Sequence, residues 1–367
     1  NSSVKIVWNQ VPIKKIKPFH VNFYVENSGS MNGYMRDGSG FKNVIHYYAN
    51  ELGDLTDSIR LNFINSEIIH FNGDIDSYIL KMTSKTFNKL GGNTSSSSLD
   101  KMFGLMLDNA DKGTVSVFFS DCLLAVPYGD ADKYFSMTKD NVKKVFCKAL
   151  EKNQELGVEI VCFSSLFQGK YYQYGKTPKL INQIRPYYMW IIGSQKNIGE
   201  INKKIKLEDF PGGYKQMVSY STCSTIPFTI LNEYGKSSKG TSLNIRTKGS
   251  KAHIIIRADL SCSLQNNPFL TDIKNYTKKS PLVQIESIKP VQEDAYTYEM
   301  AISIFGGAHV KECLKVNTMR TPSWVNSVND MTGNNLKKTE GIKFIIGGVA
   351  DAFNTIGQQK GINFIIK

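Results

Sequence analysis

The sequence of 367 residues predicts an α/β protein in which a doubly wound, mostly parallel sheet is followed by a β-rich, sandwich-like second domain. Two patterns lead to this prediction. Through residues 18–210, short apolar runs alternate with segments whose apolar residues recur at helical spacing, which is typical of strands joined by crossover helices. Beyond residue 211 the apolar period changes to two, and turn-forming residues separate the runs. The length is sufficient for two domains of ordinary size.

We expect a lead-in over residues 1–17, with an edge strand at 4–8, and a first domain over residues 18–210. The strands expected in this domain are 20–25, 59–65, 67–71, 114–119, 158–163 and 186–192. The expected helices are 41–52, 99–107, 141–152 and 198–205, and residues 76–90 are expected to form a helix or a helical loop. The run 114–119 is apolar almost throughout, as is typical of a strand covered on both faces. The segment 167–179 is rich in Tyr and Gly, and we interpret it as an extended loop or hairpin.

A Pro-Gly-Gly sequence at 211–213 marks the expected start of a β-rich domain over residues 211–320. Its candidate strands are 226–231, 242–246, 253–259, 282–288, 296–305 and 312–316. Several short strands at this spacing predict an antiparallel sandwich, of which an immunoglobulin-like sandwich is one form. Residues 321–367 are expected to form a mixed segment, with a helix at 344–353 and a final strand at 362–366.

The most informative stretch is residues 21–34, VNFYVENSGSMNGY, which predicts a buried strand that stops in a tight loop. Glu26 ends the strand, and the hydroxyls of Ser28 and Ser30 follow it. Thr94 lies in a second loop, and Asp121 follows the predicted central strand. Because the carboxyl ends of parallel strands meet at one edge of a sheet, we expect these side chains to lie together there. Their oxygens suit Mg²⁺, Mn²⁺ or Ca²⁺ and are poor ligands for Zn²⁺ or copper.

This arrangement resembles the metal-ion-dependent adhesion site of von Willebrand factor A-type (VWA) domains. That family places Asp-x-Ser-x-Ser after its first strand, a Thr in a later loop and an Asp after a central strand, and Ser28, Ser30, Thr94 and Asp121 match. The resemblance covers roughly the first 200 residues. It implies a Rossmann-like fold and a bound Mg²⁺, Mn²⁺ or Ca²⁺ with one open position. A partner protein offering an acidic residue would fill that position.

Two positions depart from the family pattern. Glu26 stands where the family usually has Asp, and Cys122 stands where it commonly has Gly. The longer Glu26 side chain is compatible with three outcomes: an ion held through water, an ion held weakly, or replacement of the ion. A purely structural alternative is also open, in which Ser28 and Ser30 cap a following helix and Glu26 bonds loop amides.

The first function hypothesis is a protein-interaction module, not an enzyme, that binds a partner through a divalent-metal-dependent adhesion-type site. The alternative is a metal-dependent hydrolase or phosphotransfer enzyme that uses the same cluster, since two carboxylates and an open metal position permit such chemistry. No nucleophile with an adjacent base is visible in the sequence: Asp121-Cys122 has no neighbouring His along the chain, and a His that meets it only in the folded protein stays an open alternative.

The formal net charge is +13, and the excess is spread along the chain mostly as Lys. This distribution favours solvated faces over a nucleic-acid-binding patch. No run of 18 apolar residues occurs, so we expect no transmembrane segment. The sequence begins with Asn rather than Met, from which we expect a removed upstream segment. That expectation favours an exported protein of the bacterial cell envelope and leaves a cytoplasmic location open.

Overall fold

The computed structural model describes residues 2–95, 98–126, 130–173, 176–212, 214–306, 309–318 and 320–367. The chain divides into two compact units, neither of which is continuous in sequence. Residues 1–16, 221–318 and 358–367 form the β unit, and residues 17–220 and 319–357 form the α/β unit. Gly213, within the expected boundary, and residues 174–175, within the expected loop, lie outside the described residues.

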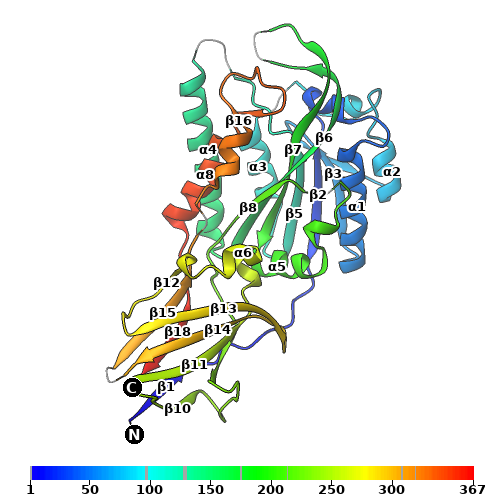
Figure 1. Ribbon diagram of the computed structural model, residues 1–367. Helices are drawn as coiled ribbons and strands as arrows, with labels where there is room; N and C mark the ends of the chain where they lie inside the picture. The colour runs from blue at the N-terminus through cyan, green and yellow to red at the C-terminus, as the bar shows by residue number, and fades with distance from the viewer. Residues whose placement is uncertain are drawn as a thin grey trace. The chain divides into compact units, whose positions relative to one another are not determined.

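The α/β unit is built on a seven-stranded sheet with the order β4-β3-β2-β5-β7-β6-β8 (Figure 1). The strands are β2 (His20–Glu26), β3 (Ile59–Ile64), β4 (Ile68–Phe71), β5 (Thr114–Ser120), β6 (Leu156–Tyr171), β7 (Lys179–Ser194) and β8 (Gln216–Ser221). β2 pairs in parallel with β3 and with β5. β4 is antiparallel to β3, and β7 is antiparallel to both β5 and β6.

The predicted doubly wound, mostly parallel sheet is therefore wrong: the sheet is mixed, and the protein also contains antiparallel sheets. The reason lies in β6 and β7. We expected short strands at 158–163 and 186–192, but both strands have 16 residues and form one long hairpin. A parallel pair needs a crossover of about a dozen residues or more, usually a helix. The short connection between β6 and β7 permits only antiparallel pairing.

Helices cover both faces of this sheet (Figure 1). They are α1 (Gly40–Leu55), α2 (Ile75–Leu80), α3 (Leu99–Asp108), α4 (Ala131–Lys152), α5 (Gln195–Lys204), α7 (Ser323–Val328) and α8 (Ile342–Ile356). The helices α3, α4 and α8 share an apolar core with one face of the sheet, including Phe118 and Trp190. On the other face, Phe41 of α1 packs against Phe119 and Tyr187.

Shorter elements complete the α/β unit. They are the 3-10 helices η1 (Gly29–Tyr34), η2 (Phe87–Lys89) and η3 (Leu207–Asp209), and the parallel pair of β16 (Asn329–Asp330) with β17 (Thr339–Glu340). The helix α4 begins ten residues before the expected start at residue 141. It packs along α8, where the rings of Phe135 and Phe344 stack with centroids 4.9 Å apart.

The β unit contains two sheets, with the orders β10-β1-β18-β15-β12 and β13-β14-β11-β9. The strands are β1 (Ser3–Trp8), β9 (Phe228–Asn232), β10 (Ser242–Arg246), β11 (Lys251–Ala258), β12 (Tyr276–Thr277), β13 (Val283–Glu293), β14 (Tyr296–Phe305), β15 (Val310–Val316) and β18 (Ile362–Ile366). Three short helices, η4 (Ser261–Ser263), α6 (Asn267–Leu270) and η5 (Ile273–Asn275), connect β11 to β12. The strand pairs are antiparallel, and buried side chains of both sheets form one apolar core.

Candidate functional site

The two carboxylates singled out from the sequence lie at the ends of neighbouring parallel strands. Glu26 is the last residue of β2, and Asp121 directly follows β5. The register pairs Val25 with Phe119, so the two strands end at the same level of the sheet. Both carboxyl groups are buried. The sheet thus presents two carboxyl groups at one edge, in a part of the molecule that excludes water.

The loop after β2 carries the two predicted serines. It folds into η1, which begins directly after Ser28 and contains Ser30. Gly33 allows η1 to approach the β6–β7 hairpin closely, because a Cβ at this position would lie 2.4 Å from the ring of Phe167. A larger residue at position 33 would therefore displace the loop that carries both hydroxyls.

Thr94 reaches the same edge from a second loop. The Gly29 amide donates a hydrogen bond to the Thr94 carbonyl oxygen at 2.8 Å. Gly92 adopts φ +68°, and a Cβ there would lie 1.9 Å from Oδ1 of the Asn65 side chain. Asn65 in turn donates from Nδ2 to the Gly91 carbonyl oxygen at 2.9 Å. The loop is therefore tied both to the end of β3 and to the start of η1.

The turn after β5 positions Asp121. Its amide donates to Sδ of Met31 at 3.3 Å, and its Oδ1 accepts from the Leu123 amide at 3.0 Å. Cys122 adopts φ +53°, a left-handed conformation that favours glycine and costs other residues roughly 1–2 kcal/mol. The Cys122 amide donates to Oγ of Ser120 at 2.8 Å, which stabilises this conformation. The structure thus gathers the loops of all five predicted residues, which we call the strand-end cluster: Glu26, Ser28, Ser30, Thr94 and Asp121.

Several oxygens in the strand-end cluster are buried without a hydrogen-bond partner in the described structure. They are both carboxylate oxygens of Glu26 and Oγ of Ser28 and of Ser30. Ser28 precedes η1 but forms no capping hydrogen bond, so the capping alternative does not describe this loop. Oδ1 of Asn27 and of Asn32 are also buried and unpaired beside them. Sequence reasoning missed these two amides, whose only signal is their place in the same loop.

The two carboxyl groups influence each other's ionisation. Burial raises the pKa of Glu26 well above its ordinary value, and the negative charge of Asp121 raises it further. Burial also raises the pKa of Asp121, against the lowering effects of a backbone hydrogen bond and of the positive charge of Arg185. Ser28 and Ser30 lie near enough to lower the pKa of Glu26 and of Asp121 respectively, although neither hydroxyl forms a hydrogen bond of ordinary geometry. Such a pair attracts a proton or a cation.

Sequence reasoning also missed Arg185, a buried cation on β7 whose charge acts on Asp121. Its guanidinium lies over the ring of Tyr171, 4.5 Å from the centroid. It also donates to the Leu336 carbonyl oxygen at 2.5 Å. The available signal was a basic residue directly before Pro186 within a largely apolar run.

The donor set of the cluster is unlike that of a zinc or copper site. Within the described residues, no group of three or more His, Cys, Asp or Glu side chains could hold a metal ion. The cluster instead combines two carboxylates with hydroxyl and amide oxygens. Mg²⁺ is commonly held by one or two carboxylates together with water and neutral oxygens. The residues present therefore fit a hard divalent cation.

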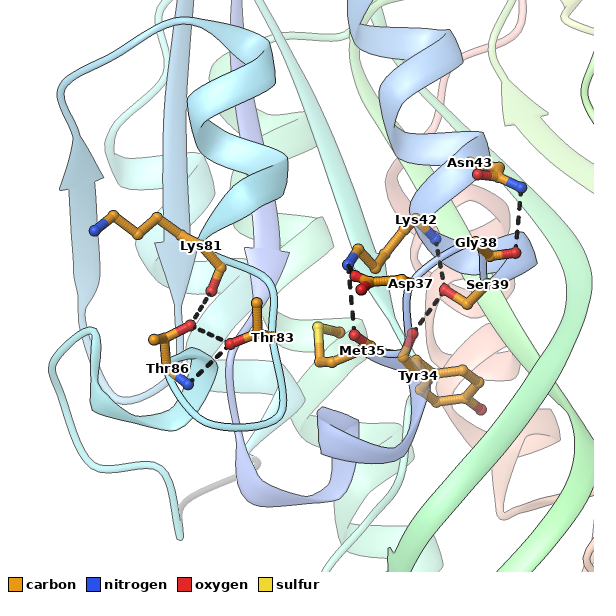
Figure 2. Close-up of polar contacts among 10 residues, drawn as sticks. All are labelled: Tyr34, Met35, Asp37, Gly38, Ser39, Lys42, Asn43, Lys81, Thr83 and Thr86. Carbon is orange, nitrogen blue, oxygen red and sulfur yellow. Dashed lines mark hydrogen bonds and ion pairs between the residues drawn. The ribbon is translucent and has the colours of Figure 1, made fainter.

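A separate polar cleft of about 570 Å³ is lined by residues of α1 and α2. Here Lys42, Asp37 and His46 already have partners. Lys42 donates to the Asp37 carboxylate at 3.1 Å and to the Met35 carbonyl oxygen at 3.5 Å, as Figure 2 shows. His46 pairs with Asp76 at 3.0 Å. We therefore look for function at the strand-end cluster, where the oxygens lack partners, rather than in this cleft.

No protein-family model matches this sequence, and no curated protein matches it. Within the described part of the chain, no helix combines the length and the apolar character needed to cross a membrane. Function is therefore inferred from the chemistry of the strand-end cluster.

Proposed function

We propose that the α/β unit is a protein-interaction module that binds its partner through a divalent cation held by the strand-end cluster. Glu26 and Asp121 supply negative charge, while Ser28, Ser30 and Thr94 supply neutral oxygens. Mg²⁺ is the expected ion, with Mn²⁺ and Ca²⁺ as substitutes. An acidic side chain of the partner completes the coordination of the ion.

The observation that carries this proposal is the group of four buried oxygens on Glu26, Ser28 and Ser30 that have no hydrogen-bond partner. Leaving a buried polar group unpaired costs about 1–3 kcal/mol. Two ionised carboxylates at one site also repel each other. A divalent cation removes both penalties, because it ligates the oxygens and balances the two charges. A merely structural Glu26 is expected to accept hydrogen bonds from loop amides, and it accepts none.

The backbone at Cys122 supports the resemblance to VWA domains. This position commonly holds Gly in that family, and Cys122 adopts the left-handed φ that glycine favours. The mixed sheet limits the resemblance, since it departs from the doubly wound arrangement at β6 and β7. The support therefore comes from the three loops and from the parallel strands β3, β2 and β5.

Calorimetric titration with MnCl₂ and with MgCl₂ tests the metal site. Wild-type protein is expected to bind one ion, and Asp121→Asn is expected to bind none. The asparagine keeps an oxygen for the Leu123 amide and removes the charge beside Glu26, so the variant should fold. Asp108→Asn, at an exposed carboxylate ending α3, is the matched control and should bind as wild type. Equal affinities of wild type and Asp121→Asn would refute the proposal.

A second measurement tests the role of the partner. Bound Mn²⁺ enhances the relaxation of water protons as long as water occupies its open position. A short peptide with one Asp should displace that water and reduce the enhancement, whereas the same peptide with Asn should not. If saturating amounts of both peptides leave the relaxation enhancement unchanged, the metal site is still supported, but its proposed function in partner binding is refuted.

A further inference from the structure

The β6–β7 hairpin extends beyond the rest of the sheet, past the carboxyl end of β5 (Figure 1). β5 pairs with β7 only as far as Ser120 opposite Tyr188. β6 and β7 continue to pair over residues 163–171 and 179–187, which we call the ribbon. Because β5 ends where the ribbon begins, the ribbon and Asp121 lie at the same edge.

One face of the ribbon is buried against the loops around the site. The ring of Phe167 lies against Gly33 of η1. Tyr171 donates from its hydroxyl to the Gly333 carbonyl oxygen at 2.9 Å. Arg185 is buried on the same face, next to the ring of Tyr171. This face is occupied by the protein itself.

The opposite face of the ribbon carries exposed aliphatic side chains. Leu166 and Ile184 lie directly opposite each other on the two strands and are 37% and 53% exposed. Leu180 lies opposite Lys170 and is 81% exposed. Side chains alternate between the faces of a strand, so these residues share the face away from Phe167. Neighbouring exposed apolar side chains are typical of an interaction surface.

The ribbon is also basic. Between Glu159 and Glu200 the sequence contains five Lys or Arg residues and no Asp or Glu. Lys170 is exposed on the same face as Leu180, whereas Lys179 lies opposite Tyr171, on the other face, and Lys176 donates to Asn334 at 3.3 Å. A partner that covers the face of Leu166, Leu180 and Ile184 meets the positive charge of Lys170 and no carboxylate of the ribbon, so an acidic side chain of the partner is expected beside Lys170.

The ribbon is continuous with the strand-end cluster through Tyr172, a half-exposed residue that follows β6. Its ring lies 3.9 Å from the position that a Cβ on Gly29 would take. Gly29 is hydrogen-bonded to Thr94 of the cluster. A single partner can therefore contact the ribbon and the cluster together.

We propose that the outer face of the ribbon docks an acidic protein segment, part of the same partner whose carboxylate reaches the strand-end cluster; the identity of that partner rests on the proposed function. Apolar side chains of the segment cover Leu166, Leu180 and Ile184, and an acidic side chain pairs with Lys170. The aliphatic centre with a single lysine favours a protein over a nucleic acid, since nucleic acids are bound through clusters of exposed Lys and Arg and through stacked aromatic rings. The arginine of this ribbon, Arg185, is buried.

The test uses a short dye-labelled peptide of alternating Glu and Leu, with a Lys–Leu peptide of the same length for comparison. Fluorescence anisotropy is measured with EDTA present, so that the metal site does not contribute. The acidic peptide should bind more tightly than the basic one, and more weakly as salt is added. Leu180→Ser and Lys170→Glu should each weaken its binding about tenfold.

Matched variants on other surfaces serve as controls. Leu80→Ser removes a leucine that is 74% exposed on α2, and Lys112→Glu reverses an exposed lysine before β5. Both should bind the acidic peptide as wild type does. Equal binding of the two peptides, or equal effects of ribbon and control variants, would overturn the proposal. Ribbon-dependent binding to phosphatidylserine vesicles without binding of the acidic peptide would also overturn it, in favour of a lipid surface.

The same variants separate this proposal from the metal site. Leu180→Ser should keep the calorimetric response to Mn²⁺ and lose peptide binding. Asp121→Asn should lose the response to Mn²⁺ and keep peptide binding in EDTA. A failure of one prediction therefore does not decide the other.

Discussion

Two glutamates of the same sheet, Glu26 on β2 and Glu159 on β6, are both fully buried, but their surroundings differ. Oε2 of Glu159 accepts a hydrogen bond from Asn202 of α5 at 2.7 Å. Burial raises the pKa of Glu159 to about 7. Neither carboxylate oxygen of Glu26 forms a hydrogen bond of ordinary geometry, and a second carboxyl group, Asp121, lies close enough to act on its pKa. Oε1 of Glu159 is also unpaired, so Glu26 differs by the second carboxyl group and the unpaired serine hydroxyls near it.

The largest expected effect is the pH dependence that Glu159 imposes on stability. Its pKa rises from an ordinary 4.5 to about 7 in the folded protein. Its contribution to stability is therefore complete below about pH 4.5 and is lost as the pH rises toward 7, by about 3 kcal/mol in all. The unfolding free energy can be measured in urea at a series of pH values. Between about pH 4.5 and 7, the unfolding free energy of Glu159→Gln should fall by about 3 kcal/mol less than that of wild type.

Two features make this measurement specific. Glu340, whose pKa burial also raises to about 7, contributes to both proteins and cancels in their difference. Glu67→Gln, at an exposed carboxylate, should follow the wild-type profile. Parallel profiles for wild type and Glu159→Gln would mean that Glu159 ionises in the folded protein as freely as in the unfolded chain.

The second prediction separates the two glutamates by their response to metal. At about 100 times its Kd, a bound ion stabilises the folded state by about 2.7 kcal/mol. Mn²⁺ should therefore raise the unfolding free energy of wild type and of Glu159→Gln by this amount. It should have little effect on Glu26→Gln, which lacks one of the two negative ligands. If Mn²⁺ raised the unfolding free energy of Glu26→Gln by the same amount, Glu26 would not be a ligand of the ion, and the contrast with Glu159 would fail.

The smallest expected effect concerns the turn that positions Asp121. Cys122→Gly and Cys122→Ala both remove the sulfur, but only alanine keeps a Cβ at the left-handed φ. The glycine variant should therefore be more stable than the alanine variant by about 1 kcal/mol in urea unfolding. The opposite order would show that the turn relaxes to an ordinary φ when the thiol is removed.

Much of the local structure followed from sequence patterns. The strands β2, β3 and β5 lie close to the expected ranges because their apolar runs are short and end in Asn, Ser or Asp. The loops of the strand-end cluster could be anticipated for the same reason, since a residue that directly follows a parallel strand lies at a known edge.

The strands that pair with each other in the sheet could not be predicted equally well from the sequence. The doubly wound arrangement failed at β6 and β7, where the tyrosine-rich segment extends both strands instead of forming a separate loop. Arg185 was missed because nothing local distinguishes a cation that is buried beside a site from one that is solvated. Its environment is made by Tyr171 and Leu336, which are distant in sequence.

The sequence by itself determined where strands end and which oxygen-bearing side chains follow them, because turn residues and apolar periodicity act within a few neighbouring positions. Only the tertiary structure decided that Glu26 and the hydroxyls of Ser28 and Ser30 have no hydrogen-bond partners, and that an exposed, basic ribbon stands beside them. Burial and pairing depend on segments far apart in the chain, and these meet only when the sheet and its loops are packed together.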